Sequence, residues 1–87
     1  MEKIRYADNV VFREEPEGGI LFNVDTGELK LVEDVAWGIC GMIDEGTDRT
    51  RILKKLRELY PDQNDLEQHL DDFLAELAES DFLAGEE

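Results

Sequence analysis

The sequence holds little of the chemistry that catalysis, cross-linking or metal binding needs. It has one Cys, one His and two Pro among 87 residues. A single Cys excludes an intramolecular disulfide, and a single His with carboxylates alone does not make a zinc site. No Gly-Lys-Ser/Thr phosphate loop occurs, and the adjacent Asp71 and Asp72 would diverge by about 100° on a helix. We therefore expect no catalytic residue, no metal and no cofactor.

Long hydrophobic runs and an excess of basic charge are also missing. No apolar run approaches the roughly 20 residues of a membrane span, and the N-terminal segment lacks the apolar core of a signal peptide. The formal net charge of -14 opposes binding to nucleic acids and to anionic membranes, which carry the same sign. Together with the single Cys, these absences favour a cytoplasmic protein with no nucleic-acid and no membrane partner.

The residues that are present suffice for one small folded domain. Apolar side chains make up 41% of the chain, more than a solvated acidic tail would carry. We expect a single domain over residues 1–87, ordered over about residues 4–83 and frayed at its end. The acidic excess is uneven, because residues 62–87 hold ten acidic side chains and no basic one.

Three short apolar runs occupy the first third of the chain, at residues 10–13, 20–23 and 28–32. Turn-forming residues separate them at 16–19 and 25–27, which predicts an antiparallel meander of three strands. In the third run, Leu29 and Leu31 alternate with polar neighbours, so one face of this strand should be buried and the other exposed to water.

The hydrophobic period then changes to that of a helix in three segments, at about residues 35–43, 52–60 and 66–77. Thr47 or Asp48 can cap the second helix, and Asn64 is the expected N-cap of the third. Gly38 and Gly41 weaken the first helix and therefore predict close packing against another backbone. The predicted fold is α+β: a three-stranded antiparallel sheet followed by three helices, similar to a winged helix-turn-helix.

Two features could bind a partner. The third strand is a potential sheet edge whose unpaired backbone groups can accept an extended peptide, although Glu28 and Lys30 also fit an edge that is merely protected from pairing. The middle helix carries five basic residues between positions 49 and 57. These fit a winged-helix DNA-binding regulator or a general protein-docking adaptor, or else cations that balance neighbouring carboxylates.

The order of these segments resembles the PqqD-like peptide chaperones, which are also called RiPP recognition elements. The matching stretches are GILFN at 19–23, TGELKL at 26–31, the helix at 36–43 with DEGT at 44–47, Ile52, Leu56 and Tyr60, and HLDDFLAEL at 69–77 with DFL at 81–83. This chain departs from the family in having Val32 where a capping Asn is common, His69 where an Asp is common, and Asp81 in place of a Gly.

The resemblance implies a non-catalytic domain that binds the leader segment of a ribosomally made precursor peptide. It implies that the leader adds as a strand against the third strand, beside the third helix, and is presented to a modifying enzyme, commonly a radical SAM protein. We expect a monomer or a weak homodimer, because an exposed strand edge can also pair with a second copy.

The candidate peptide-binding residues lie on these two elements. The backbone of the third strand would supply the hydrogen-bond ladder, at Glu28, Leu29, Lys30, Leu31 and Val32. Apolar pockets would be lined by Leu29 and Leu31 and by the stripe of the third helix, at Leu66, Leu70, Phe73 and Leu77. His69 and Glu76 are the expected polar contacts on the rim. The stripe fits a core equally well, and the sequence leaves open which flank of the helix faces the sheet.

Overall fold

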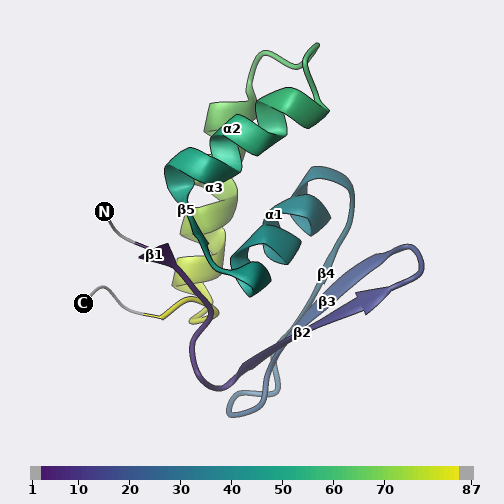
Figure 1. The fold of residues 1–87 in the computed structure, drawn as a ribbon. Coiled ribbons are helices and arrows are strands. Elements are labelled where there is room, and N and C mark those ends of the chain that lie inside the picture. Colours follow the sequence, from purple (N-terminus) through teal and green to yellow (C-terminus); the bar gives the residue numbers. More distant parts are fainter. Residues whose placement is uncertain (1–2, 85–87) are drawn as a thin grey trace.

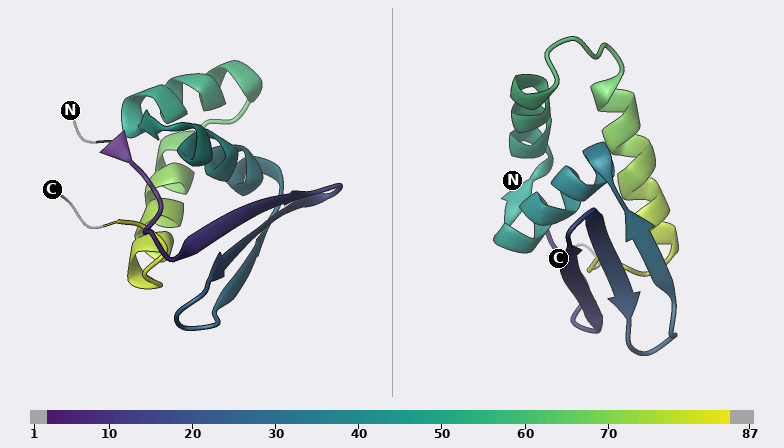
Figure 2. Two further views of the ribbon diagram at one scale, coloured as in Figure 1. Left: turned by 60° about the horizontal axis from the view of Figure 1, so that its bottom comes forward. Right: turned by 90° about the vertical axis from the view of Figure 1, so that its right-hand side faces the viewer.

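The computed structural model describes residues 3–84, in which three helices lie on one side of a three-stranded antiparallel sheet (Figures 1 and 2). The sheet consists of β2 (Val10–Glu15), β3 (Gly18–Asn23) and β4 (Leu29–Val32), and the helices are α1 (Asp34–Glu45), α2 (Arg49–Leu59) and α3 (Leu66–Glu79). The expected α+β class, with three strands before three helices, is confirmed. The expected fraying concerns residues 85–87, which lie outside the described residues.

A second, two-stranded sheet was not predicted. It pairs β1 (Lys3–Ile4) with β5 (Thr47–Asp48), and Ile4 lies opposite Thr47. Strands of two residues are too short to show the alternation by which a strand is recognised in a sequence. This pairing ties the N-terminal segment to the connection between α1 and α2 (Figure 1).

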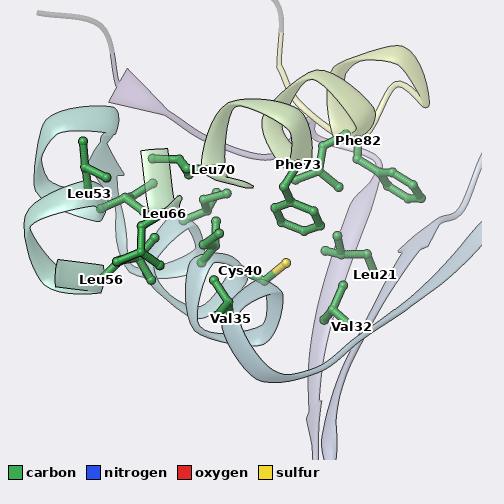
Figure 3. Close-up of a cluster of buried hydrophobic side chains, with 14 residues drawn as sticks. Leu21, Val32, Val35, Cys40, Leu53, Leu56, Leu66, Leu70, Phe73 and Phe82 are labelled. Atoms are coloured by element: carbon green, nitrogen blue, oxygen red, sulfur yellow. The ribbon is translucent and has the colours of Figure 1, made fainter. Parts of the chain in front are cut away.

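The core lies between the sheet and the helices (Figure 3). The sheet contributes Leu21 and Val32, whose side chains are 0% and 4% exposed. From the helices and the C-terminal segment the core receives Val35, Ile39, Cys40, Ile43, Ile52, Leu53, Leu56, Leu66, Leu70, Phe73, Leu77 and Phe82. No helix within residues 3–84 lies against the opposite face of the sheet (Figure 2).

The connection between β2 and β3 is shorter than the sequence predicted. Gly18 and Gly19, expected in the turn, belong to β3, and the turn itself is residues 16–17. A Cβ on Gly18 would clash with the carbonyl oxygen of Val32, and one on Gly19 would lie 2.8 Å from the ring of Phe12. These glycines are therefore needed for close approach within the sheet rather than for turn geometry.

Helix α2 begins as predicted and α3 does not. The Asp48 carboxylate accepts the backbone N–H of Arg51 at 2.9 Å, so Asp48 is the cap among the two candidates. The predicted Asn64 cap is wrong, because the N-cap of α3 is Asp65, whose side chain makes no capping hydrogen bond. No helix within residues 3–84 is long and apolar enough to cross a membrane.

Candidate functional site

Strand β4 is an edge of the sheet, since the strand order is β2-β3-β4. The backbone N–H of Asn23 donates to the carbonyl oxygen of Glu28 at 2.9 Å. In an antiparallel ladder, directly opposite residues alternate between hydrogen-bonded and non-hydrogen-bonded pairs. Lys30 therefore directs its backbone groups toward β3, whereas the N–H and C=O of Leu29 and Leu31 face away from the sheet. These outward groups are the ones that an additional strand would use.

The side chains of β4 divide between two faces. Val32 is buried on the helix side, and Lys30 is half-buried there. Leu29 and Leu31 lie on the opposite face, with exposed fractions of 54% and 72%. The predicted alternation is present, but the exposed members are the leucines, the reverse of what hydrophobicity alone would give.

One ion pair identifies the flank of α3 that faces β4. The Lys30 ammonium group lies 2.8 Å from the carboxylate of Glu76. His69 and Asp72 share this flank of α3, because they lie seven and four residues before Glu76 on the same helix. Both expected rim residues, His69 and Glu76, are therefore on the β4 side of the helix; whether they contact a peptide remains a prediction.

A depression of about 530 Å³ lies beyond the end of β4, lined by Glu33, Asp34, Tyr60, Gln63 and His69 together with apolar groups of α1. Lys30 pairs with Glu76 toward the end of α3, whereas Glu33, just after β4, lines the same depression as His69 near the start of α3, so β4 and α3 run in opposite directions. An extended chain added to β4 would thus pass successive groups of both elements.

The apolar stripe of α3 is part of the core. Leu66, Leu70 and Leu77 are at most 2% exposed, and Phe73 is 7% exposed and points toward Leu21 and Val32 (Figure 3). Of the two interpretations that the sequence left open for this stripe, the structure shows the core one. Direct contact of these four side chains with a peptide would require them to move, and it stays untested.

The structure adds apolar residues that the sequence did not select. Val11, Ile20 and Phe22 lie on the same outer face of the sheet as Leu29 and Leu31, by the strand register. The signal was present in the sequence, since Ile20 and Phe22 alternate with the buried Leu21 and Asn23. Continuous apolar character in residues 20–22 concealed this alternation.

Asn23 holds the turn that leads into β4. Its side chain is fully buried, and its amide oxygen accepts the backbone N–H groups of Asp25 at 2.9 Å and Thr26 at 3.1 Å. Its amide nitrogen donates to the carbonyl oxygen of Asp81 at 3.4 Å. Asp81 has a left-handed φ of 63°, as expected for a residue in the place of a Gly. One side chain thereby connects the start of β4 to the segment after α3.

The opposite flank of α3 is occupied by α2. The Arg49 guanidinium donates to both carboxylate oxygens of Asp71, at 2.7 and 2.9 Å, and to Glu67 at 2.8 Å. These hydrogen bonds hold the pKa of the Asp71 carboxyl below its usual range. Arg49 thus matches the interpretation in which cations of α2 balance neighbouring carboxylates.

The only Cys is part of the core. Burial raises the pKa of the Cys40 thiol to about 11, so that it stays protonated at neutral pH. The Tyr6 hydroxyl donates to the carbonyl oxygen of Cys40 at 2.7 Å, and burial holds the pKa of Tyr6 above its ordinary value. Within residues 3–84, no three His, Cys, Asp or Glu residues are grouped so as to hold a metal ion.

The fold and the free edge beside α3 define an α+β domain of the winged helix-turn-helix-like kind that was expected from the sequence. The chain belongs to the PqqD family: it matches the description "Coenzyme PQQ synthesis protein D (PqqD)" over residues 18–83. The expected resemblance to PqqD-like RiPP recognition elements is thereby confirmed.

A solved structure of the same fold is "TbiB1 in Complex with the TbiA(beta) Leader Peptide". Its TM-score is 0.87 at 25% sequence identity, and the match covers 93% of this chain and 95% of that chain. Among curated proteins, no sequence matches significantly.

Proposed function

We propose that this chain is a non-catalytic recognition domain that binds the leader segment of a ribosomally made precursor peptide by strand addition to β4. The observation that carries the proposal is the free edge of β4, where the backbone groups of Leu29 and Leu31 face away from β3. The membership of this chain in the PqqD family supports the same assignment. So does its similarity to a protein whose structure was solved in complex with a leader peptide.

Strand addition separates affinity from selectivity. Backbone hydrogen bonds from residues 28–32 contribute affinity without regard to the leader sequence, whereas alternate side chains give selectivity. His69 and Glu76 would be the polar contacts on the α3 side. The core residues of α3, at Leu66, Leu70, Phe73 and Leu77, would act chiefly by holding this flank in place, and Val32 would form part of the floor between β4 and α3.

The partners follow from this role. The domain would present the bound leader to a modifying enzyme, for which a radical SAM protein is our candidate, and would need no cofactor of its own. The protonated, buried Cys40 suits the reducing cytoplasm, where ribosomal precursors are made. We expect the protein without a bound leader to be a monomer or a weak homodimer.

The test replaces Leu31 with Pro. The N–H of Leu31 takes no part in the β3–β4 ladder, so Leu31→Pro should remove a hydrogen-bond donor to the leader while the sheet remains. With isotopically labelled protein and a synthetic leader of the precursor encoded beside this gene, we expect amide shifts over residues 28–32 in the wild type. In the variant, the affinity should fall by about tenfold, the equivalent of roughly 1.4 kcal/mol.

The matched control is Glu14→Pro at the other edge of the sheet. By the same alternation, the N–H of Glu14 faces away from β3 on strand β2, so this variant loses an edge donor on the wrong side. Circular dichroism of both variants checks that they fold. Equal weakening by the two variants, or a folded Leu31→Pro protein that binds as the wild type does, would contradict strand addition at β4.

A further inference from the structure

Helix α2 carries most of the positive charge of this acidic chain. Five of the nine basic residues lie between Arg49 and Arg57, and this stretch has no acidic residue. All 23 acidic side chains and only four basic ones belong to the rest of the chain. Helix α2 is therefore a local region of positive potential on a molecule that is negative elsewhere.

The domain uses only part of this charge internally. Arg49 is held on the α3 side by two carboxylates of that helix, at 2.7 and 2.8 Å. Arg51 and Arg57 approach carboxylates only to 3.8 Å, and their side chains are 78% and 62% exposed. Lys54 and Lys55 are exposed, and neither forms an ion pair in the part of the chain that the structure describes. The interpretation in which cations of α2 balance neighbouring carboxylates thus holds for Arg49 and leaves both lysines without a role.

The weakly paired and unpaired cations share the outer face of α2 with an exposed leucine. Arg51, Lys55 and Leu59 follow one another at intervals of four residues and so form one ridge of the helix. Lys54 lies on the neighbouring ridge beside Glu58, the single acidic residue of α2. The Leu59 side chain is 54% exposed. The face thereby combines an apolar group with a charged rim, as protein interfaces do.

This face is separate from the proposed leader site. Helix α2 packs on α1, α3 and β5, at the end of the domain away from the β2-β3-β4 sheet (Figures 1 and 2). The flank of α3 that carries Glu76 faces β4, whereas Asp71 on the other flank pairs with α2. A partner on the outer face of α2 therefore leaves the edge of β4 open.

We infer that the outer face of α2, formed by Arg51, Lys54, Lys55 and Leu59, docks an acidic surface of the modifying enzyme. This inference rests on the proposed function, because it gives the enzyme one face of the domain and the leader another. An acidic surface is attracted to α2 and repelled by the rest of a chain with a net charge of -14. The charge distribution thus fixes the orientation of docking and speeds association, and burial of Leu59 adds an apolar contact.

Two other occupants fit this face less well. DNA would bring its phosphates close to the carboxylates of α3 that pair with Arg49, and the net charge of the chain opposes such binding. A second copy would have to place one of its acidic surfaces on α2. Such a head-to-tail contact joins two different surfaces and generates rings or filaments rather than a closed dimer.

The experiment measures the affinity of the full chain for the modifying enzyme encoded beside its gene, by isothermal titration calorimetry. Lys55→Glu should weaken binding by at least about fivefold, as expected for reversal of one interfacial charge. The matched control is Arg13→Glu, which changes the net charge equally on β2, where the side chain is 73% exposed. Leu59→Ser should weaken binding by about threefold, the equivalent of one partly buried apolar side chain. Its control is Val24→Ser, since Val24 is 55% exposed.

Both controls should bind the enzyme as the wild type does. Equal weakening by Lys55→Glu and Arg13→Glu, wild-type affinity of Lys55→Glu, or no binding of the wild type overturns docking at α2. Sedimentation velocity and fluorescence anisotropy with a labelled DNA duplex test the two other occupants. Self-association or DNA binding that Lys55→Glu abolishes would assign the face to that occupant and also overturn the inference.

Titration with the precursor leader separates this inference from the proposed function. Lys55→Glu should bind the leader with wild-type affinity, because the leader site is on β4. If the leader shifts residues 28–32 while enzyme binding does not respond to Lys55→Glu, strand addition stands and the docking face is wrong. If the leader leaves residues 28–32 unshifted while Lys55→Glu still weakens enzyme binding, strand addition fails and the docking face stands.

Discussion

At the scale of single residues, the glycines of this chain differ in whether the structure has room for a side chain in their place. A Cβ on Gly19 would lie 2.8 Å from the Phe12 ring, whereas nothing lies within 4 Å of one on Gly38 or Gly41. The close backbone packing expected at Gly38 and Gly41 is therefore wrong. The first helix carries these two glycines without a packing reason in the described part of the chain.

Replacement by Ala should then change stability in opposite directions. Gly38→Ala relieves the entropic cost of Gly in a helix and should raise the free energy of unfolding by up to about 1 kcal/mol. Gly19→Ala forces the Phe12 ring aside and should lower it by about 1–3 kcal/mol. Urea unfolding of the two variants measures both values. A destabilised Gly38→Ala variant would mean that α1 contacts something that the structure does not show.

The Arg49–Asp71 pair makes a prediction about protonation. The pKa of Asp71 is lowered by hydrogen bonds from Arg49, so the folded pKa is below the unfolded one. The pair's contribution to stability is present above the unfolded pKa and is lost as the pH falls through the folded pKa. Because Arg49 and Asp71 are on the surface, we expect a small effect on stability and a clear one on titration.

Carbon-detected NMR titration of the side-chain carboxyl groups measures this directly. In the wild type, Asp71 should titrate below the usual Asp range, and in Arg49→Gln it should return toward that range. An Asp71 pKa that does not respond to Arg49→Gln would contradict the pair.

At the scale of elements, the turn between β3 and β4 depends on one buried side chain. The Asn23 amide oxygen accepts two backbone N–H groups of this turn. Asn23→Ala leaves these donors without their acceptor and should cost about 1–3 kcal/mol of stability. Hydrogen exchange of the β4 amides should also accelerate, because the turn fixes the start of that strand.

The control for Asn23 is Asn64→Ala, since Asn64 is exposed and does not cap α3. Its stability should stay within about 0.5 kcal/mol of the wild type. Global unfolding and hydrogen exchange are measured on both variants. If Asn64→Ala costs as much as Asn23→Ala, then Asn64 caps α3 in solution and the assigned start of the helix is wrong.

The elements themselves could be predicted because their periods are local. Alternation and turn residues predict the three strands, and the spacing of 3.6 residues predicts the three helices. The flank of α3 that faces β4 could not be predicted, because it depends on Lys30 meeting Glu76, 46 residues further along the chain. For the same reason the sequence could not separate the core residues of α3 from candidate binding residues, since both are apolar at the same spacing.

At the scale of the whole molecule, the excess of negative charge should destabilise the folded state but favour binding of a positively charged leader. The chain has 23 acidic and 9 basic side chains, so the folded state repels itself. Added salt screens this repulsion and should raise the Tm. A leader that carries Lys or Arg is instead attracted by the α3 flank with Asp72 and Glu76, and salt should weaken that attraction.

The last prediction uses this opposition. Between about 50 and 500 mM NaCl, a range over which the screening length falls severalfold, the Tm should rise while the association rate with the leader falls by about tenfold or more. Thermal unfolding and stopped-flow fluorescence of Trp37 measure the two quantities on the same samples. Because the protein becomes more stable over this range, slower association cannot be attributed to loss of the fold. Association that is insensitive to salt would show that the acidic flank contributes to solubility and not to leader capture.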